Sequence, residues 1–297
     1  MQHETLMAKT LPDFIIIGAM RAGTTSLHNY FQRHPQVSMS HDKEPNYFTE
    51  KKYELGEDWY VGQFDVGQMF RGEASPNYAK VDVFPGVPER IHRDLPDVKL
   101  VYVVRDPVKR FVSQYDHMVS RGFGLPEPGE LCRHEDPLPP EPVRLTLDEP
   151  YRHILSISCY ARQLKAYLHH FPLEQIKIVE FERLKQEPEV VLEDLQAFLG
   201  LDPLGPRTLP LLNRSKELTS VPQPILRSAR DTRIGNWVRD RMSLETRDRL
   251  KRLIAAPFPD TKRAFPDEAI HRVRRDLADD IAEFRELTGM PFSSWSV

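Results

Sequence analysis

Short apolar runs alternate with amphipathic stretches along the first 200 residues, and this alternation predicts strands and helices in turn. The runs are rich in β-branched residues and end at turn residues, which is typical of buried strands. We expect strands at Phe14–Ile17, Val37–Met39, Met69–Glu73, Val98–Val104 and Gln175–Glu180. We expect helices at Thr24–His34, Val87–Leu95, Val108–Arg121, Ile157–His170, Pro188–Leu199, Leu244–Ile254 and Glu268–Leu287.

This order of elements predicts an α/β fold, with a central parallel sheet flanked by helices. A chain of 297 residues can bury one large core. We therefore expect residues 1–297 to form a single domain. Within it, 1–12 is expected to be a flexible N-terminus, and 122–150, rich in proline, glutamate and glycine, a long loop or lid. The segment 202–232 is a second break in the pattern.

Composition narrows the function classes. A net charge of −3 provides no general basic field, so we expect no nucleic-acid partner. The chain has two cysteines, Cys132 and Cys159, which imply no disulfide framework and favour a cytoplasmic setting. Residues 1–13 carry no apolar signal core, and the longest apolar run is far below the ~20 residues of a membrane span. Oligomeric state stays open.

The turn after the first expected strand predicts an anion site. Residues 15–27 read IIIGAMRAGTTSL, which is a strand, a glycine-containing turn and a helix start. Backbone N–H groups at a helix N-terminus lack helical partners, and the helix dipole adds positive charge there. The segment differs from the nucleotide-triphosphate loop G-x-x-x-x-G-K-[ST], because Thr24 stands at the lysine position and Arg21 precedes Gly23. A plain glycine turn is the alternative.

A second segment predicts another anion contact. Residues 103–115 read VVRDPVKRFVSQY, in which Asp106 suits a helix N-cap and Pro107 the first helical turn. Arg105 therefore lies at the carboxyl edge of the sheet, where ligands of open α/β sheets bind. Its planar guanidinium suits a phosphate, and Ser113 offers a hydroxyl from the following helix. The alternative is an Arg105 that pairs with an acidic neighbour.

These two segments resemble the two cofactor signatures of sulfotransferases that use 3′-phosphoadenosine-5′-phosphosulfate (PAPS). The first resembles the loop that holds the 5′-phosphosulfate, and the second the element that holds the 3′-phosphate. The resemblance extends to KEPNYF at 43–48, GEASPNY at 72–78 and SCY at 158–160, in the same order along residues 12–200. The heparan sulfate and glycosaminoglycan branch and its bacterial relatives are the closest in appearance.

The resemblance implies an enzyme with a P-loop-like phosphate-binding turn. It implies transfer of a sulfuryl group from PAPS to an acceptor hydroxyl on a carbohydrate or small molecule, with 3′-phosphoadenosine-5′-phosphate (PAP) as product and no metal. The residues implied to bind the donor are Arg21, Ala22, Gly23, Thr24, Thr25, Ser26, Arg105 and Ser113.

The resemblance also implies two catalytic residues. Glu44 aligns with the family's catalytic glutamate in a Lys-Glu-x-x-x-Phe pattern, which makes it the expected general base. Arg21 is expected to stabilise the leaving phosphate, because it stands where the family usually has lysine and arginine stays protonated. A structural Glu44, paired with Lys43 or Arg21, is the alternative. Glu73 is the second candidate base and His41 the third.

Several positions leave the acceptor open. Asn46 stands where glycosaminoglycan relatives often have histidine, and Ala74 where they often have lysine. Tyr160 suits either the cleft or the core, and Trp295 is expected to tie down the C-terminal tail. Arg230 and Arg233 are candidates for a late contact with the 3′-phosphate.

Two other function classes remain open. One is a nucleotide-dependent kinase or related phosphotransferase with an unusual loop, which would need ATP and magnesium. The other is a catalytically inactive nucleotide-binding protein on the same scaffold, for which Arg21 in place of lysine is the main support.

Overall fold

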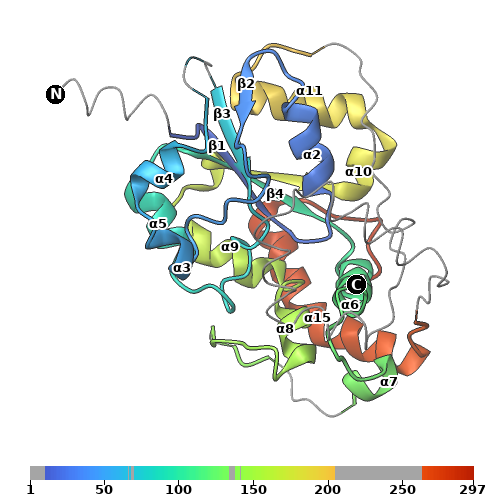
Figure 1. Ribbon diagram of the computed structural model, residues 1–297. Helices are drawn as coiled ribbons and strands as arrows, with labels where there is room; N and C mark the ends of the chain where they lie inside the picture. The colour runs from blue at the N-terminus through green and yellow to red at the C-terminus, as the bar shows by residue number, and fades with distance from the viewer. Residues whose placement is uncertain (1–10, 66, 68–69, 134–137, 141, 205–262) are drawn as a thin grey trace, which may run out of the picture.

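The centre of the protein is a five-stranded parallel sheet (Figure 1). The computed structural model describes residues 11–65, 67, 70–133, 138–140, 142–204 and 263–297. The strands are β1 (Phe14–Gly18), β2 (Val37–Met39), β3 (Phe70–Ala74), β4 (Lys99–Val104) and β5 (Ile176–Glu180), in the order β2-β3-β1-β4-β5. Every pair of neighbours is parallel, which confirms the predicted α/β fold with a central parallel sheet.

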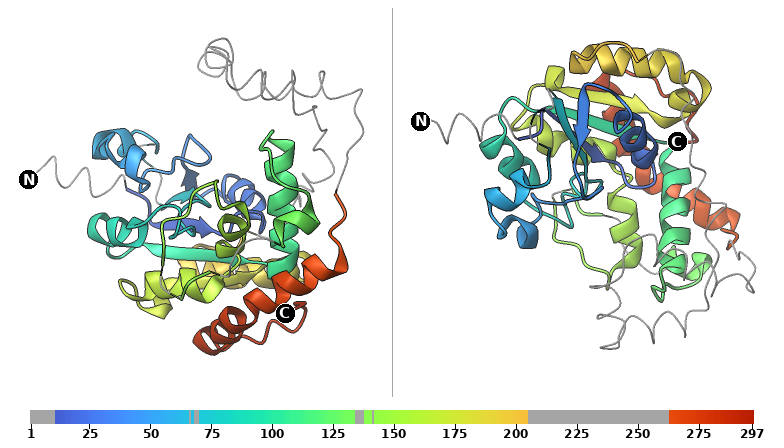
Figure 2. Two further views of the ribbon diagram at one scale, coloured as in Figure 1. Left: turned by 90° about the horizontal axis from the view of Figure 1, so that it is seen from below. Right: turned by 45° about the horizontal axis from the view of Figure 1, so that its top comes forward.

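Helices cover both faces of this sheet (Figures 1 and 2). One face is covered by α2 (Thr24–Phe31), α10 (Phe181–Gln186) and α11 (Pro188–Leu199), and the other by α5 (Val87–Asp94), α9 (Tyr160–Leu168) and α15 (Asp267–Thr288). The remaining helices are α3 (Glu50–Tyr53), α4 (Glu57–Val61), α6 (Pro107–Ser120), α7 (Pro128–Leu131) and α8 (Pro150–Ser156). A 3₁₀ turn, η1 (Leu173–Gln175), precedes β5.

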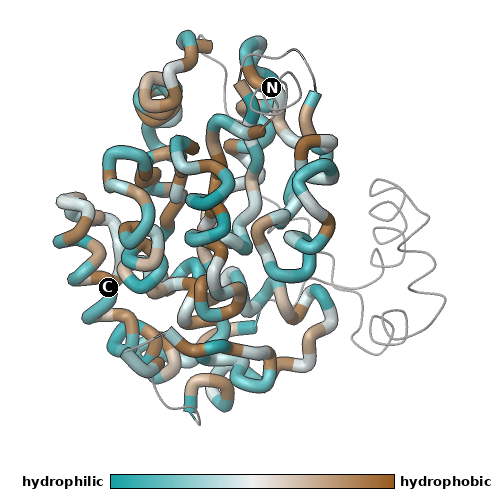
Figure 3. The backbone as a smooth tube through the Cα atoms, turned by 90° about the vertical axis from the view of Figure 1, so that its left-hand side faces the viewer, coloured by the Kyte–Doolittle hydropathy of each residue, from teal (hydrophilic) through white to brown (hydrophobic). Residues whose placement is uncertain are grey.

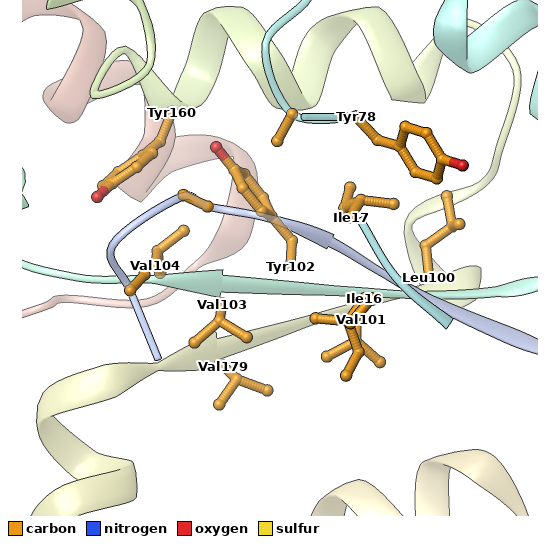
Figure 4. Close-up of a cluster of buried hydrophobic side chains, with 14 of the residues drawn as sticks. Ile16, Ile17, Tyr78, Leu100, Val101, Tyr102, Val103, Val104, Tyr160 and Val179 are labelled. Carbon is orange, nitrogen blue, oxygen red and sulfur yellow. The ribbon is translucent and has the colours of Figure 1, made fainter. Parts of the chain in front are cut away.

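The central strands are apolar on both sides because both sides are covered. On β4, Leu100 and Tyr102 point toward α9, whereas Val101 and Val103 point toward the opposite helical layer (Figure 4). All four are fully buried. Strands in doubly covered parallel sheets are expected to read as continuous apolar runs. The helices instead alternate hydrophobic and hydrophilic positions along the tube of Figure 3.

The structure departs from the predicted elements at several helix ends and contains helices that were not predicted, namely α3, α4, α7, α8 and α10. Helix α2 ends at Phe31 rather than at His34. The expected helix from Ile157 begins at Tyr160 instead, because residues 157–159 form the turn that joins α8 to α9. Part of the expected loop 122–150 is structured, since it contains α7 and buries Leu145.

Some predictions lie outside the described residues. They are the helix at Leu244–Ile254, the candidates Arg230 and Arg233, and almost all of the second break in the pattern, 202–232. The flexible N-terminus at 1–12 and the single domain at 1–297 therefore stay predictions. Within the described part of the chain, no helix combines the length and apolar character that crossing a membrane would need.

Candidate functional site

The turn between β1 and α2 needs glycine at two positions. A Cβ on Gly18 would lie 2.6 Å from the Cβ of Ala79. Gly23 has φ +96°, and a Cβ there would lie 2.6 Å from the Phe181 ring. A side chain at either position would collide with its neighbour, and at Gly23 the backbone conformation itself favours glycine. The turn is therefore held against both the segment after β3 and the start of α10.

The N-terminus of α2 is open to an anion. Gly23 is its N-cap and supplies no side-chain hydrogen bond, and the first turn contains no acidic residue. The first N–H groups of a helix have no partner within it, and the helix dipole favours negative charge beside them. Thr24 and Ser26 are buried, while Thr25 is partly exposed. This arrangement suits a phosphate or sulfonate group.

Three residues predicted to bind the donor meet in the structure. The Arg21 Nε donates a hydrogen bond to the Ser113 Oγ at 3.1 Å, across 92 positions of sequence. The Arg105 guanidinium donates to the Arg21 carbonyl at 3.3 Å, across 84 positions. Arg21 has φ +72°, a left-handed conformation that costs a non-glycine residue about 1–3 kcal/mol and that clusters at ligand sites. Strand ends β1 and β4 thus bring two cationic side chains and a hydroxyl together.

Arg105 is positioned by aromatic residues. Its guanidinium lies over the Phe181 ring, 5.4 Å from the ring centroid. The Tyr160 hydroxyl donates to the Arg105 carbonyl at 2.7 Å and accepts from its N–H at 3.3 Å. Tyr160 is fully buried, so the core alternative holds for that residue. Among the described residues, the buried Arg105 Nε has no hydrogen-bond partner and no carboxylate forms an ion pair with Arg105.

The cap of α6 also holds the C-terminal tail. The Asp106 carboxylate accepts the Lys109 N–H at 3.0 Å, as predicted for an N-cap. It also accepts the Ser296 N–H at 2.9 Å and the Ser296 hydroxyl at 3.1 Å. Trp295 is buried and stacks on Phe292, with ring centroids 4.1 Å apart. The expectation that Trp295 ties down the tail is confirmed.

Glu44 occupies an exposed position on the loop that follows β2. Its carboxylate is 2.5 Å from the Lys43 ammonium, so the ion pair named as the alternative role is present. The loop is tied to the sheet two residues later. The Asn46 N–H donates to the Ser75 Oγ at 3.0 Å, and the Ser75 hydroxyl donates to the Glu73 carboxylate at 3.0 Å. Glu73 therefore supports the loop that carries Glu44.

Glu73 itself has no exposed surface. The Tyr60 hydroxyl donates to its Oε1 at 2.8 Å, and Ser75 occupies Oε2. Burial raises the pKa of this carboxyl to about 7, although its hydrogen bonds act in the opposite direction. The third candidate, His41, is exposed and pairs with Asp65 at 2.9 Å. Of the three candidates for a base, Glu44 and His41 are accessible from the surface.

Sequence reasoning missed Lys80. Lys80 is 6% exposed, and its Nζ lies 3.3 Å from the Met20 Sδ, directly beside the turn after β1. Burial, and to a lesser degree the Arg110 guanidinium, lowers the pKa of this ammonium to about 7, while the Glu44 carboxylate raises it. A lysine that closely follows a buried strand was the only signal in the sequence, and it does not distinguish a buried lysine from an exposed one.

Two histidines adjoin Lys80. Burial, followed by the charge of Arg21, lowers the pKa of His117 to about 3, and burial followed by the charge of Lys80 lowers that of His153 to about 4. The Nδ1 atoms of both histidines are buried and lack hydrogen-bond partners among the described residues.

In the same described ranges, no group of three or more histidine, cysteine, aspartate or glutamate residues is arranged to hold a metal ion.

The sequence and the fold were compared with known proteins. A family model described as "Sulfotransferase domain" matches residues 11–261. Mouse heparan sulfate glucosamine 3-O-sulfotransferase 3B1 is 34% identical over 197 residues, which cover 65% of this chain and 47% of the relative. The membrane-associated sulfotransferase kil1 of Dictyostelium discoideum is 27% identical over 270 residues, which cover 65% and 56%. The chain thus spans about half the length of these curated relatives.

Among solved structures, a sulfotransferase from Alicyclobacillus acidocaldarius superimposes with a TM-score of 0.60 at 23% sequence identity. The superposition covers 96% of this chain and 99% of the bacterial one. At that level of identity, the likeness shows a shared fold.

Proposed function

This chain belongs to the sulfotransferase family, and from that premise we propose that it transfers a sulfuryl group from PAPS to an acceptor hydroxyl. The observation that supports the proposal most is the meeting of Arg21, Arg105 and Ser113 at the ends of β1 and β4. The turn and α2 would hold the 5′-phosphosulfate with the N–H groups and hydroxyls of residues 21–26. Arg105 and Ser113 would hold the 3′-phosphate, which ATP lacks.

The proposed reaction is an in-line displacement. The acceptor oxygen forms a bond to sulfur while the bond from sulfur to the 5′-phosphate oxygen breaks, and PAP leaves with that electron pair. Arg21 offsets the charge that develops on the leaving phosphate. Glu44 takes the acceptor's proton. We favour Glu44 over Glu73 because Glu44 is exposed on its loop, whereas both oxygens of Glu73 are bound in the interior.

The acceptor class is the least constrained part. A carbohydrate hydroxyl is our first proposal, because curated relatives are named for heparan sulfate glucosamine. A small-molecule hydroxyl is the second. A cytoplasmic location stays a prediction, and one relative is named as membrane-associated.

A ligand-binding experiment tests the proposal. The melting temperature of the purified protein should rise with PAP and respond much less to ATP plus magnesium at equal concentration, because a ligand of the native state stabilises it. A preference for ATP would favour a phosphotransferase instead. Transfer of labelled sulfate from PAPS to a panel of sugars and small alcohols then separates an enzyme from an inactive binding protein. Binding of PAP without transfer to any acceptor would favour the inactive protein.

A further inference from the structure

We infer that Lys80 is a further catalytic residue of the proposed transfer, and that its ammonium binds the sulfonate oxygens of the donor while the sulfuryl group moves. The inference rests on the proposed function, because it requires a sulfonate beside the turn that follows β1. It adds a cation to Arg21 and Arg105, and this cation comes from the segment after β3.

The position of Lys80 supports this role. Its Nζ contacts the sulfur of Met20, and Met20 directly precedes Arg21 in the turn. A lysine with 6% exposure normally has a carboxylate or several oxygen atoms around its ammonium. Here a thioether, a weak acceptor, is the hydrogen-bond partner found in the described residues, and no described carboxylate pairs with Lys80. A buried cation in this state lacks an anion.

The groups around Lys80 favour an anion as the missing partner. Arg110 on α6 is fully buried and donates to the Ser158 hydroxyl and the Ile154 carbonyl, both at 2.5 Å. Its NH1 lacks a partner in the described part of the chain. His117 on α6 and His153 on α8 each have a buried Nδ1 with no hydrogen-bond partner among the residues that the structure describes. Lys80, Arg110, His117 and His153 together form what we call the nitrogen-rich cluster.

One carboxylate opposes them. Glu44, on the loop after β2, partly offsets the effect of burial on Lys80, but it is already paired with Lys43. Among the described residues, the nitrogen-rich cluster therefore has no carboxylate bound to it. A sulfonate seated next to Met20 would provide a bound anion.

Charge balance predicts a proton movement. Burial, aided by Arg110, brings the pKa of Lys80 to about 7, so at pH 8 much of it is neutral before the donor binds. A sulfonate beside it favours the charged form, so binding should take up a proton. His117 and His153, with pKa values of about 3 and about 4, stay neutral at that pH. Within this cluster, Lys80 is the residue expected to gain the proton.

Isothermal titration calorimetry at pH 8 tests the inference. PAPS and PAP are titrated into the full chain in two buffers of different ionisation enthalpy, which gives both affinity and proton uptake. The variants are Lys80→Met, which removes the charge, and Lys80→Arg, which keeps it permanently. Lys165→Met is the matched control, because Lys165 forms an exposed ion pair with Glu283.

In Lys80→Met, the affinity for PAPS should fall roughly 10- to 100-fold, as for loss of one charge-assisted contact. The affinity for PAP, which lacks the sulfonate, should change much less. Proton uptake on binding PAPS should be lower in Lys80→Met than in the wild type by up to one proton. Protons gained or lost by PAPS itself are the same in both proteins and cancel in this difference. Lys80→Arg should bind PAPS better than Lys80→Met does and take up no proton at this position. The control should match the wild type.

Equal PAPS affinity and equal proton uptake in the wild type and Lys80→Met would overturn the inference. So would an equal loss of affinity for PAPS and PAP, because the contact would then not be to the sulfonate. An unfolded Lys80→Met protein would likewise overturn it, since removing a buried charge without a partner should not destabilise the fold. If the wild type binds neither nucleotide, the proposed function itself fails, which is a distinct result.

Discussion

The two sides of the proposed site differ in how their polar groups are satisfied. On the donor side, defined as Arg21, Arg105 and Ser113, the residues bind one another although they are far apart in the sequence. On the transfer side, defined as Glu44 and Lys80 around the sulfuryl group that moves, Glu44 pairs with the adjacent Lys43 and Lys80 contacts a thioether. The donor side is thus organised by the sheet before any ligand binds. The transfer side has polar groups that a ligand must complete.

This difference in hydrogen bonding indicates that the two sides control different properties of the proposed enzyme. A preorganised group of cations at strand ends lowers the cost of binding an anionic donor. Exposed or half-buried positions of the loop after β2, such as Asp42 and Lys43, can vary without disturbing the core, so they suit the choice of acceptor. Single substitutions on each side can separate donor binding from turnover.

The largest expected effect belongs to Glu44→Gln. Loss of a general base should lower turnover by roughly 10²- to 10⁴-fold, because the acceptor would keep its proton. PAP affinity should stay within about twofold of the wild type. Steady-state assays with an identified acceptor, together with calorimetry, measure both. Glu50→Gln, at an exposed position paired with Arg144, is the control and should retain activity. Full activity in Glu44→Gln would remove it as the base.

The next largest effect is on stability and concerns Glu73, which supports the loop that carries Glu44. Its pKa of about 7 lies above the ordinary 4.5, so between these values the folded state binds more protons than the unfolded state. The free energy of unfolding should therefore fall as pH rises from 4.5 to 7, by about 3 kcal/mol in total. Urea unfolding at several pH values should show this decline relative to Glu73→Gln. Parallel pH curves for the two proteins would contradict a raised pKa.

Arg105→Ala tests the donor side. It should weaken PAP binding roughly 10- to 100-fold, since it removes a charge-assisted contact. The same variant should bind adenosine 5′-phosphosulfate as the wild type does, because that ligand lacks the 3′-phosphate. Arg183→Ala, in an exposed ion pair with Glu187, serves as the reference. An equal loss for both nucleotides would mean that Arg105 does not contact the 3′-phosphate.

The smallest effect is expected for Ser75→Ala, which cuts the link between Glu73 and the Asn46 N–H. Stability should fall by about 1 kcal/mol, because a buried carboxylate oxygen and an N–H lose their partner. Turnover should fall more than PAP affinity, since the link positions the Glu44 loop. Thr146→Ala, on the surface, is a suitable comparison. A matched loss of PAP affinity would show that the two sides are coupled.

The sequence predicted the five strands because each is a compact apolar run that ends at turn residues. Helix α11 was predicted at its observed bounds, since Pro188 begins it and Gly200, with φ +77°, ends it. Helix α10 was missed, because it begins directly after β5 with no turn residue between them. Helix α8 was missed altogether, and α9 begins three residues later than predicted, since no glycine or proline marks its start at Tyr160.

The site was predictable where chemistry and position coincide. Arg21, Arg105 and Ser113 each follow a strand in a short motif, so topology alone brings them to one edge of the sheet. Lys80 follows β3 without such a motif, and its burial depends on packing that one sequence does not reveal. The same holds for Glu73, whose partners Tyr60 and Ser75 come from separate elements. Their roles in binding and catalysis stay predictions.

The anchoring of Ser296 on Asp106 has a practical consequence. Ser296 binds Asp106, the residue that follows Arg105 in the sequence. The Arg285 guanidinium donates to the Val297 carbonyl at 2.6 Å. An affinity tag appended after Val297 would therefore emerge next to the start of α6. Purification handles are better placed ahead of β1, at the opposite end of the chain from this cap.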